Sequence, residues 1–195
     1  MFWVVSYVAP YLKTLTWHQE AMLSVVSLLT SVGFFKTLSW LLGLLMSLSG
    51  LVRKKVLGAH YMHGTWIGWF IGHSKDKRYM VEYYSQDLDS LSITGQSFND
   101  KLDLHGQWTS DAVTVDIRHG QLVFTYTFDV ITNSAPLAGV HTSILERTGP
   151  HEAPIALKGF AHDLNDPTRI AVHSIKLSDE FKPLAEALEE AKKRF

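Results

Sequence analysis

Gly64-Thr65-Trp66-Ile67-Gly68-Trp69-Phe70 is the stretch of sequence that decides the fold of this chain. Successive side chains of a β-strand point to opposite faces, so Gly64, Trp66 and Gly68 share one face of such a strand. Glycine lets a neighbouring backbone approach closely, and the large indole of Trp66 can fill the space that remains. The stretch therefore predicts a strand whose Trp66 face is buried.

Alternation of apolar and polar residues continues along the chain, with turn-forming residues about every ten positions, as is typical of consecutive antiparallel strands. It is clearest in Leu122 to Val130, where Phe124, Tyr126 and Phe128 share one face. Arg118 to Gln121 is a candidate hairpin turn. The sequence predicts eight or nine strands: His60 to Ile71, Arg78 to Tyr84, Leu88 to Ser97, Leu102 to Trp108, Ala112 to Arg118, Gln121 to Thr132, Leu137 to Arg147, Pro154 to Ala161 and Arg169 to Leu177.

Short consecutive strands of this kind favour an up-and-down β-barrel, with a β-sandwich as the alternative. Gly64 and Trp66 at the start of the first strand are similar to the Gly-x-Trp of calycin-like barrels, lipocalins among them, in which the indole fills the floor of the barrel. We therefore expect an all-β soluble domain over residues 58–177, folded as a compact calycin-like barrel of about eight strands.

The last segment, residues 178–195, changes to a helical period. Ser178 can cap a helix, with Asp179 and Glu180 in its first turn. Its apolar residues recur at helical spacing, and its charges form two favourable pairs four residues apart. We expect an amphipathic C-terminal helix with the stripe Leu184, Leu188, Ala191 and Phe195 and the pairs Glu189 with Lys193 and Glu190 with Arg194.

The first 57 residues are of a different kind, because only three charged residues precede the cluster Arg53 to Lys55. Ala21 to Phe35 and Thr37 to Val52 are uncharged runs on either side of Lys36. As one helix, Ala21 to Val52 would be about 48 Å long, too long for one upright crossing of a hydrocarbon core of about 30 Å. We therefore expect a transmembrane helical hairpin with a basic junction over residues 1–57.

The position of the two crossings stays open. In one arrangement the chain turns at Lys36, and in the other Phe2 to Trp17 forms the first crossing, with His18 to Glu20 as the turn. In both, the basic cluster Arg53 to Lys55 marks the cytoplasmic side by the positive-inside rule. The alternatives are a cleaved signal peptide, which the order of charges opposes, and an apolar hairpin buried in a soluble protein.

Composition excludes several classes of function. A net charge of -1 opposes binding to DNA or RNA, and the lack of cysteine excludes disulfides and thiolate chemistry. The sequence has none of the common phosphate-binding, hydrolase or metalloprotease motifs. Its ten histidines are scattered, and Asp163 with Asp166 lies in a turn-rich stretch that favours a solvated role. We expect no enzymatic activity, no catalytic residues, no cofactor and no metal.

The chain resembles the two-transmembrane β-barrel effectors of bacterial cyclic-oligonucleotide antiphage signalling, usually called CBASS. The resemblance lies in the order and size of the parts: an apolar hairpin, the basic junction Arg53 to Lys55, the strand opening Gly64-Thr65-Trp66 and a compact barrel. The stretch Lys158 to Asp163, followed by the strand from Arg169, is similar to the closing strands of that family.

This resemblance implies a function in antiphage defence. The cytoplasmic barrel would bind a cyclic dinucleotide made during infection, which would drive homo-oligomerisation of the transmembrane segment and disruption of the bacterial inner membrane. The implied partners are a cyclic dinucleotide, the lipid bilayer and other copies of the chain, and DNA and RNA are not among them. Death of the infected cell would follow, without any bond being made or broken by this protein.

A pocket for a cyclic dinucleotide needs aromatic rings for the bases, cations for the phosphates and hydroxyl groups. In the membrane segment, small residues allow helices to approach closely, and Gly43, Ser47 and Gly50 recur on one helix face as a candidate oligomer contact. The candidate ligand-binding residues are Trp66, Tyr83, Tyr84, Tyr126 and Phe128 for stacking, Arg78, Arg118 and Arg169 for phosphate, and Ser92 and Thr94 for polar contacts.

Two other functions stay open. The barrel can be a membrane-tethered carrier or sensor of an apolar ligand without killing activity, which an interior mainly of Ile, Leu and Phe would favour. Arginines that point inward would favour a nucleotide instead. The chain can also be an assembly protein whose barrel is filled by its own side chains. The sequence does not separate these functions.

Overall fold

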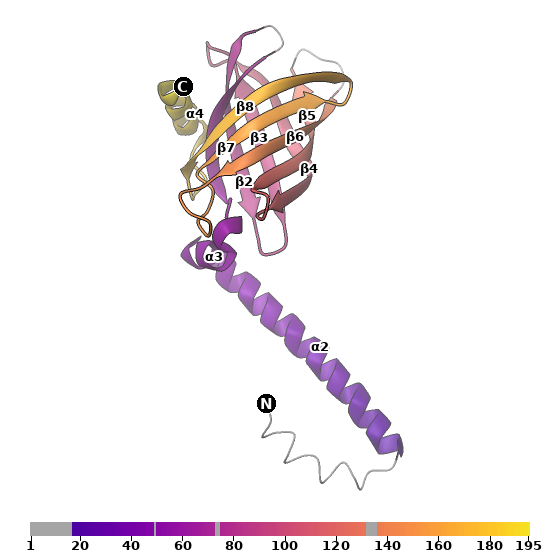
Figure 1. Cartoon of the computed structure of the whole chain (residues 1–195). Coiled ribbons are helices and arrows are strands. Elements are labelled where there is room, and N and C mark those ends of the chain that lie inside the picture. Colours follow the sequence, from indigo (N-terminus) through magenta and orange to yellow (C-terminus); the bar gives the residue numbers. More distant parts are fainter. Residues whose placement is uncertain (1–16, 49, 73–74, 132–135) are drawn as a thin grey trace. The chain divides into compact units, whose positions relative to one another are not determined.

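The computed structural model describes residues 17–48, 50–72, 75–131 and 136–195. The chain divides into two compact units, Met1–Leu45 and Met46–Phe195. The first contains most of a long apolar helix, and the second contains a β-barrel with a short helix before it and another after it (Figure 1).

Helix α2 (Trp17–Leu48) is continuous through Lys36, so of the two arrangements that the sequence left open, the one that turns at this residue is wrong. Leucine-rich sequence with good helix formers continues on both sides of Lys36, and neither proline nor a glycine pair interrupts it there. The alternative first crossing, from Phe2, lies almost entirely outside the described residues. A single crossing helix is therefore what the described part of the chain contains.

Residues Ser24–Leu44 of α2 have a mean hydropathy of 1.6 and are the one described helical segment long and apolar enough to cross a membrane. The hydroxyls of Thr30, Ser31 and Thr37 donate hydrogen bonds to backbone carbonyls one turn earlier. Such bonds satisfy polar groups within the helix, as an apolar surrounding requires. The length, the composition and these bonds all suit a lipid environment.

The second unit opens with α3 (Gly50–Leu57), which carries Arg53, Lys54 and Lys55, and a short 3₁₀ helix, η1 (Gly58–His60). Eight antiparallel strands follow and form a closed barrel in sequence order, with β8 hydrogen-bonded to β1 (Figure 1). The strands are β1 (Gly64–Ile71), β2 (Lys77–Gln86), β3 (Leu91–Phe98), β4 (Leu104–Asp116), β5 (Gln121–Val130), β6 (Leu137–Glu146), β7 (Ala156–Asp163) and β8 (Asp166–Ser178). The predicted up-and-down barrel is confirmed.

The count of eight corrects one prediction. The strands expected at Leu102 to Trp108 and Ala112 to Arg118 are the two halves of β4, joined through a register shift between Ser110 and Ala112. The polar residues at this point have the composition of a turn, but a β-bulge accommodates the extra residue and lets the strand continue. At β8, the turn is Leu164 with Asn165, and the strand already begins at Asp166.

Gly64 and Trp66 occupy the places that the sequence predicts. Gly64 has a φ of +125°, and a Cβ atom there would lie 2.1 Å from the carbonyl oxygen of Ser178, so only glycine fits. Trp66 is fully buried, and its indole Nε1 donates a hydrogen bond to the carbonyl of Met62 at 2.9 Å. It packs inside the barrel with a buried cluster of Met62, Tyr84, Ile93, Leu122, Phe124, Tyr126, Leu145 and Leu157, here called the floor cluster.

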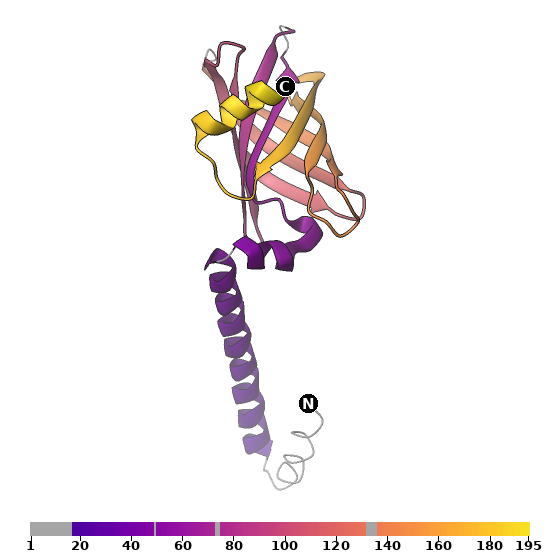
Figure 2. The same ribbon diagram turned by 90° about the vertical axis from the view of Figure 1, so that its left-hand side faces the viewer.

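Helix α4 (Leu184–Arg194) packs against the outside of β1 and β2 (Figure 2). Ala187, Leu188 and Ala191 are buried there against Ile67 and Val81, which confirms the predicted apolar stripe. The predicted start at Ser178 is wrong, because Pro183 is the N-cap and the residue before a proline disfavours helical backbone. Ser178 instead accepts a hydrogen bond from the backbone N–H of Glu180.

The charged pairs on α4 are confirmed in part. Arg194 pairs with Glu190 at 3.1 Å, as the spacing predicts. Lys193 also lies nearest to Glu190, at 3.7 Å, rather than forming its ion pair with the expected Glu189. These pairs are solvent-exposed, so they contribute little to the stability of the helix.

Candidate functional site

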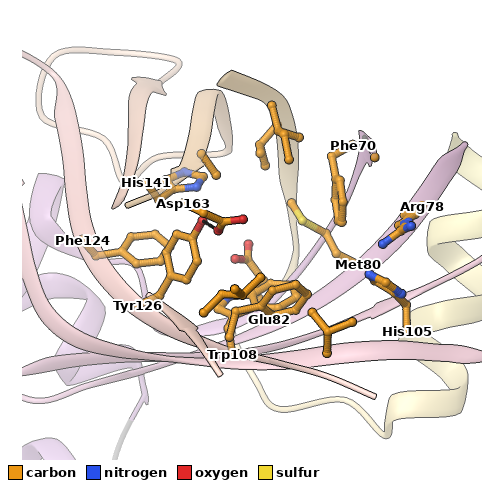
Figure 3. Close-up of a pocket in the computed structure, with 17 residues that line it drawn as sticks. Phe70, Arg78, Met80, Glu82, His105, Trp108, Phe124, Tyr126, His141 and Asp163 are labelled. Atoms are coloured by element: carbon orange, nitrogen blue, oxygen red, sulfur yellow. Dashed lines mark hydrogen bonds between the residues drawn. The ribbon is translucent and has the colours of Figure 1, made fainter. Parts of the chain in front are cut away.

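A cavity of about 360 Å³ opens at one end of the barrel, where β1, β5 and β7 end and β2, β6 and β8 begin (Figure 3). The floor cluster closes the barrel on the other side of this cavity. Ligand pockets have volumes of about 300–1,000 Å³, so the cavity is large enough for a small ligand. Its lining residues are Phe70, Gly72, Arg78, Met80, Glu82, His105, Trp108, Phe124, Tyr126, Phe128, Val130, Leu137, His141, Ala161, Asp163, Ile170 and Val172.

Aromatic rings form much of the cavity wall. Trp108 and Phe128 meet edge to face with ring centroids 5.9 Å apart, and Phe124 and Tyr126 do the same at 6.2 Å. Trp108 lies over its cross-strand partner Gly95, where a Cβ atom would be 2.2 Å from the indole. The absence of a side chain at Gly95 therefore makes room for this ring.

Glu82 is the most deeply buried acid of the cavity, with 2% of its surface exposed. Its Oε2 accepts hydrogen bonds from the hydroxyls of Ser174 at 3.3 Å and Tyr84 at 3.5 Å. Burial raises the pKa of Glu82 to about 7, and hydrogen bonds from Ser174, Trp108 and Tyr84 partly oppose this rise. The carboxyl group therefore changes between its protonated and ionised forms near neutral pH.

His141 is buried on the opposite wall and stacks on Phe124 with ring centroids 4.6 Å apart. Its Nε2 lies within hydrogen-bonding distance of the Ser143 hydroxyl. Burial lowers the pKa of His141 to about 4, so the imidazole is neutral at physiological pH. It offers the cavity a polar group without a charge.

Asp163, at the end of β7, accepts a hydrogen bond from the phenolic hydroxyl of Tyr126 at 3.2 Å. Burial raises the pKa of Tyr126, and the neighbouring carboxylate adds to this effect. Asp163 was expected to be a solvated turn residue, but it lines the cavity. Asp163 and Glu82 therefore place carboxyl groups on two different walls.

Arg78 lies near the mouth of the cavity, at the start of β2, and its side chain is 15% exposed. Its Nε donates to Oδ2 of Asp76 at 2.8 Å, and this hydrogen bond lowers the pKa of Asp76. Burial, and to a lesser degree the charge of Arg78, lower the pKa of the nearby His105. The mouth thus combines a cation with a neutral imidazole.

Three of the ten residues that the sequence predicts for ligand binding line the cavity: Arg78, Tyr126 and Phe128. Trp66 and Tyr84 also point into the barrel but are fully buried in the floor cluster. Because they pack at the closed end, their rings serve the core.

The other five predicted residues lie away from the cavity. Tyr83 points outward, and its hydroxyl donates to the Lys182 carbonyl at 3.0 Å. With Thr94 it borders a second hollow, of about 500 Å³, on the outer surface beside Leu184. The remaining three are exposed: Ser92 on β3, Arg118 in the turn between β4 and β5, and Arg169 on β8, where its guanidinium lies 4.4 Å from the centre of the Phe160 ring.

Sequence reasoning missed Glu82, His105, Trp108, His141 and Asp163. A signal for Glu82 was present, because it lies between Met80 and Tyr84 in the inward phase of a strand, where an acid is unusual. No comparable signal marked His105 or Trp108. His105 lies at a register shift opposite Ser97 and Phe98, and the strand phase of Trp108 is separated from that of Val113 by the bulge in β4.

Gly43 of α2 and Gly50 of α3 have open space where a Cβ would be, and the side chain of Ser47 lies outside the described residues. Among the residues that the structure describes, no group of three His, Asp or Glu side chains is placed to hold a metal ion.

No protein-family model matches the chain, and searches of curated proteins and of solved structures gave no significant match. The class that the structure itself defines is a closed eight-stranded barrel with an open cavity, in a chain that also carries one apolar helix long enough to cross a membrane.

Proposed function

We propose that this protein is a membrane-anchored sensor whose barrel binds a cyclic dinucleotide, and that it acts as an effector in antiphage defence. The observation that carries the proposal is Arg78, a cation at the mouth of a cavity lined by aromatic rings. Nucleotides need this combination, because their bases stack on rings and their phosphates pair with guanidinium groups.

The deep part of the cavity supports a base as the inserted group. Glu82 and His141 lie deep in the cavity among the aromatic rings, where they offer polar contacts to a bound ligand. A hydrocarbon chain would give Glu82 and His141 no hydrogen bonds beyond those that they already form within the protein, which costs free energy at a buried polar group. A planar heterocycle with polar edges compensates them.

The size of the cavity favours partial insertion. A volume of about 360 Å³ suits one nucleobase with its sugar better than a whole cyclic dinucleotide. The phosphates then stay at the mouth beside Arg78 and His105. This arrangement leaves the second base exposed, where it can contact another copy of the chain.

The membrane part of the proposal rests on α2 and on the resemblance to CBASS effectors. Ser24–Leu44 is long and apolar enough to cross the bilayer, and residues before Trp17 would supply the second crossing of a hairpin. The basic residues Arg53, Lys54 and Lys55 favour a cytoplasmic barrel on the bacterial inner membrane. Bound ligand would favour the oligomer, with Gly43, Ser47 and Gly50 at helix contacts, and the oligomer would disrupt the membrane.

The test is ligand binding by the full chain in detergent micelles, measured by calorimetry with a panel of cyclic dinucleotides. We expect one or two of them to bind, and Arg78→Ala to weaken this binding about tenfold or more, as the loss of a charged hydrogen bond predicts. Arg169→Ala is the matched control, because this arginine lies outside the cavity. A panel in which nothing binds would rule out the sensor.

A second function, binding of an apolar ligand without killing activity, has one observation in its favour. The wall that includes Met80, Leu137, Ile170 and Val172 is aliphatic. Displacement of a fluorescent fatty acid from the cavity separates the two functions. If fatty acids bind and cyclic dinucleotides do not compete, the carrier function replaces the sensor.

A further inference from the structure

Glu82 occupies a place that the stability of the fold does not explain. It lies in the middle of β2, pointing inward, with Tyr84 on the side of the floor cluster and Met80 and Arg78 on the side of the mouth. Figure 3 shows its carboxyl group directed into the cavity. A buried acid destabilises a fold unless its partners compensate it. The position therefore calls for another reason.

The partners of Glu82 within the fold are neutral and distant. Ser174 and Tyr84 donate to Oε2 at 3.3 and 3.5 Å, beyond the usual range of about 2.5–3.0 Å for hydrogen bonds between oxygens. The third hydrogen bond to Glu82 comes from the side chain of Trp108, which is also a neutral donor. Within the described part of the chain, no ion pair involves Glu82. Its capacity to accept hydrogen bonds is thus largely unused.

A second acceptor faces the same space. Asp163 lines the opposite wall and accepts a hydrogen bond from the Tyr126 hydroxyl, whereas Arg78, the one lysine or arginine among the described residues that line the cavity, lies at the mouth. The interior therefore offers acceptors rather than donors. A ligand that enters must bring N–H donors to compensate them.

The nucleobases differ in the donors that they present. Guanine carries two adjacent N–H donors, at N1 and at its 2-amino group, which match the two oxygens of one carboxylate. Adenine presents one donor beside an acceptor, and uracil presents one donor between two acceptors. The ionised carboxylate therefore distinguishes guanine from the other two by hydrogen bonding. Because the pKa of Glu82 is about 7, the two N–H donors of guanine favour its deprotonated form.

We propose that Glu82 is the specificity-determining residue of the cavity and selects a guanine base by accepting hydrogen bonds from its N1–H and 2-amino groups. This inference rests on the proposed function, since it names the base that the sensor recognises. The rings of Trp108 and Phe128 hold the plane of the base, and Glu82 reads its edge.

The experiment uses the full chain in detergent micelles and three ligands, the cyclic dinucleotides with two guanines, two adenines or two uracils. For the wild type we expect the guanine ligand to bind at least about tenfold more tightly than the others, as one matched pair of hydrogen bonds predicts. Glu82→Gln keeps the size of the side chain but turns a donor toward the base. It should remove most of this preference and change the affinity for the adenine ligand less than threefold, on the order of 0.6 kcal/mol or less.

Two further variants make the result interpretable. Glu82→Asp keeps the carboxylate and should retain the order of affinities with weaker binding. Ser92→Ala lies on the outer face and should leave all three affinities unchanged. The melting temperature of each variant, measured in the same micelles, reports whether it is folded.

The outcomes separate the two proposals. If cyclic dinucleotides bind without a preference for guanine, or if Glu82→Gln leaves the preference intact, the role of Glu82 is overturned while the sensor stands. If the wild type binds none of the three, the proposed function fails together with the inference. If only the variants unfold, the ranking measured for the wild type still decides, because a preference for adenine or uracil contradicts recognition by a carboxylate.

Discussion

The two ends of the barrel are built from the same eight strands but are filled in opposite ways. At the closed end, Trp66, Tyr84 and Leu122 are fully buried and pack against one another in the floor cluster. At the open end, Phe70, Phe128 and Leu137 stand around a cavity of about 360 Å³. Closure of a sheet into a barrel therefore does not decide whether its interior is solid, because the side chains at each level do.

The difference also separates stability from function. Close packing without voids gives the largest stabilisation per residue, whereas a cavity leaves the side chains around it without contacts on one side. The ionisable side chains Glu82, His141 and Asp163 border the cavity, whereas Gln86 and Lys176 lie at the closed end beside Met62 and Trp66. The closed end holds the fold, and the open end is available for a ligand.

The largest expected effect contrasts one ring from each end. Trp66→Ala should lower the free energy of unfolding by about 3–5 kcal/mol, because it empties a site that is fully surrounded. Phe128→Ala should cost less than half as much, since one side of this ring already faces the cavity. Chemical denaturation of the full chain in micelles measures both, and equal losses would mean that the two ends are packed alike.

The next prediction concerns Glu82, which lies between the packed end of the barrel and the cavity. The pKa of Glu82 is raised from 4.5 to about 7 in the folded protein, so its contribution to stability is full below about pH 4.5 and is lost as the pH rises through 7. Relative to the Glu82→Gln variant, the free energy of unfolding of the wild type should therefore fall by on the order of 3 kcal/mol as the pH rises from 4.5 to above 7. Denaturation curves across this range give the difference.

Exposed Ser92 on β3 provides the control, since Ser92→Ala removes no titrating group and should give a difference that does not change with pH. If the difference in unfolding free energy between the wild type and Glu82→Gln were also independent of pH, the Glu82 carboxyl would be solvated. The cavity would then extend further toward the packed end of the barrel than the structure indicates.

His141 should behave in the opposite sense. Its pKa is lowered from 6.5 to about 4, so its contribution is full above about pH 6.5 and is lost as the pH falls toward 4. Relative to His141→Gln, the wild type should lose on the order of 3 kcal/mol as the pH falls across this range. The same denaturation series measures it, and a loss on raising the pH would contradict the buried, neutral imidazole.

The smallest effect concerns the mouth. Asp76→Asn removes a partly exposed ion pair with Arg78 and should change the free energy of unfolding by about 1 kcal/mol. The freed guanidinium should then bind the phosphates of a cyclic dinucleotide more tightly, which calorimetry measures. Weaker binding in this variant would mean that Asp76 orients Arg78 for the ligand.

The barrel could be predicted from the sequence because its pattern is local. Phe124, Tyr126 and Phe128 alternate without interruption and share one face as predicted, and in the structure this is the face that lines the cavity. Gly64 and Trp66 identified the floor for the same reason. The apolar stripe of α4 follows helical spacing, although Pro183 places the start of the helix later than Ser178.

The site was harder to predict because it depends on the phase of each strand. Arg78 and Arg169 look equivalent in the sequence, yet one points into the cavity and the other lies outside over Phe160. The bulge in β4 sets the direction of Trp108, and a register shift by one residue would turn it outward. Local patterns give the alternation but not which of its two phases is buried.

The ring of backbone hydrogen bonds from β1 round to β8 and back has a consequence for assembly. A strand at the margin of an open sheet offers unpaired N–H and C=O groups to which another chain can add a strand. Each of the eight described strands has neighbours on both sides, so the barrel itself offers no such template. Any contact between two barrels would therefore use side chains rather than an added strand.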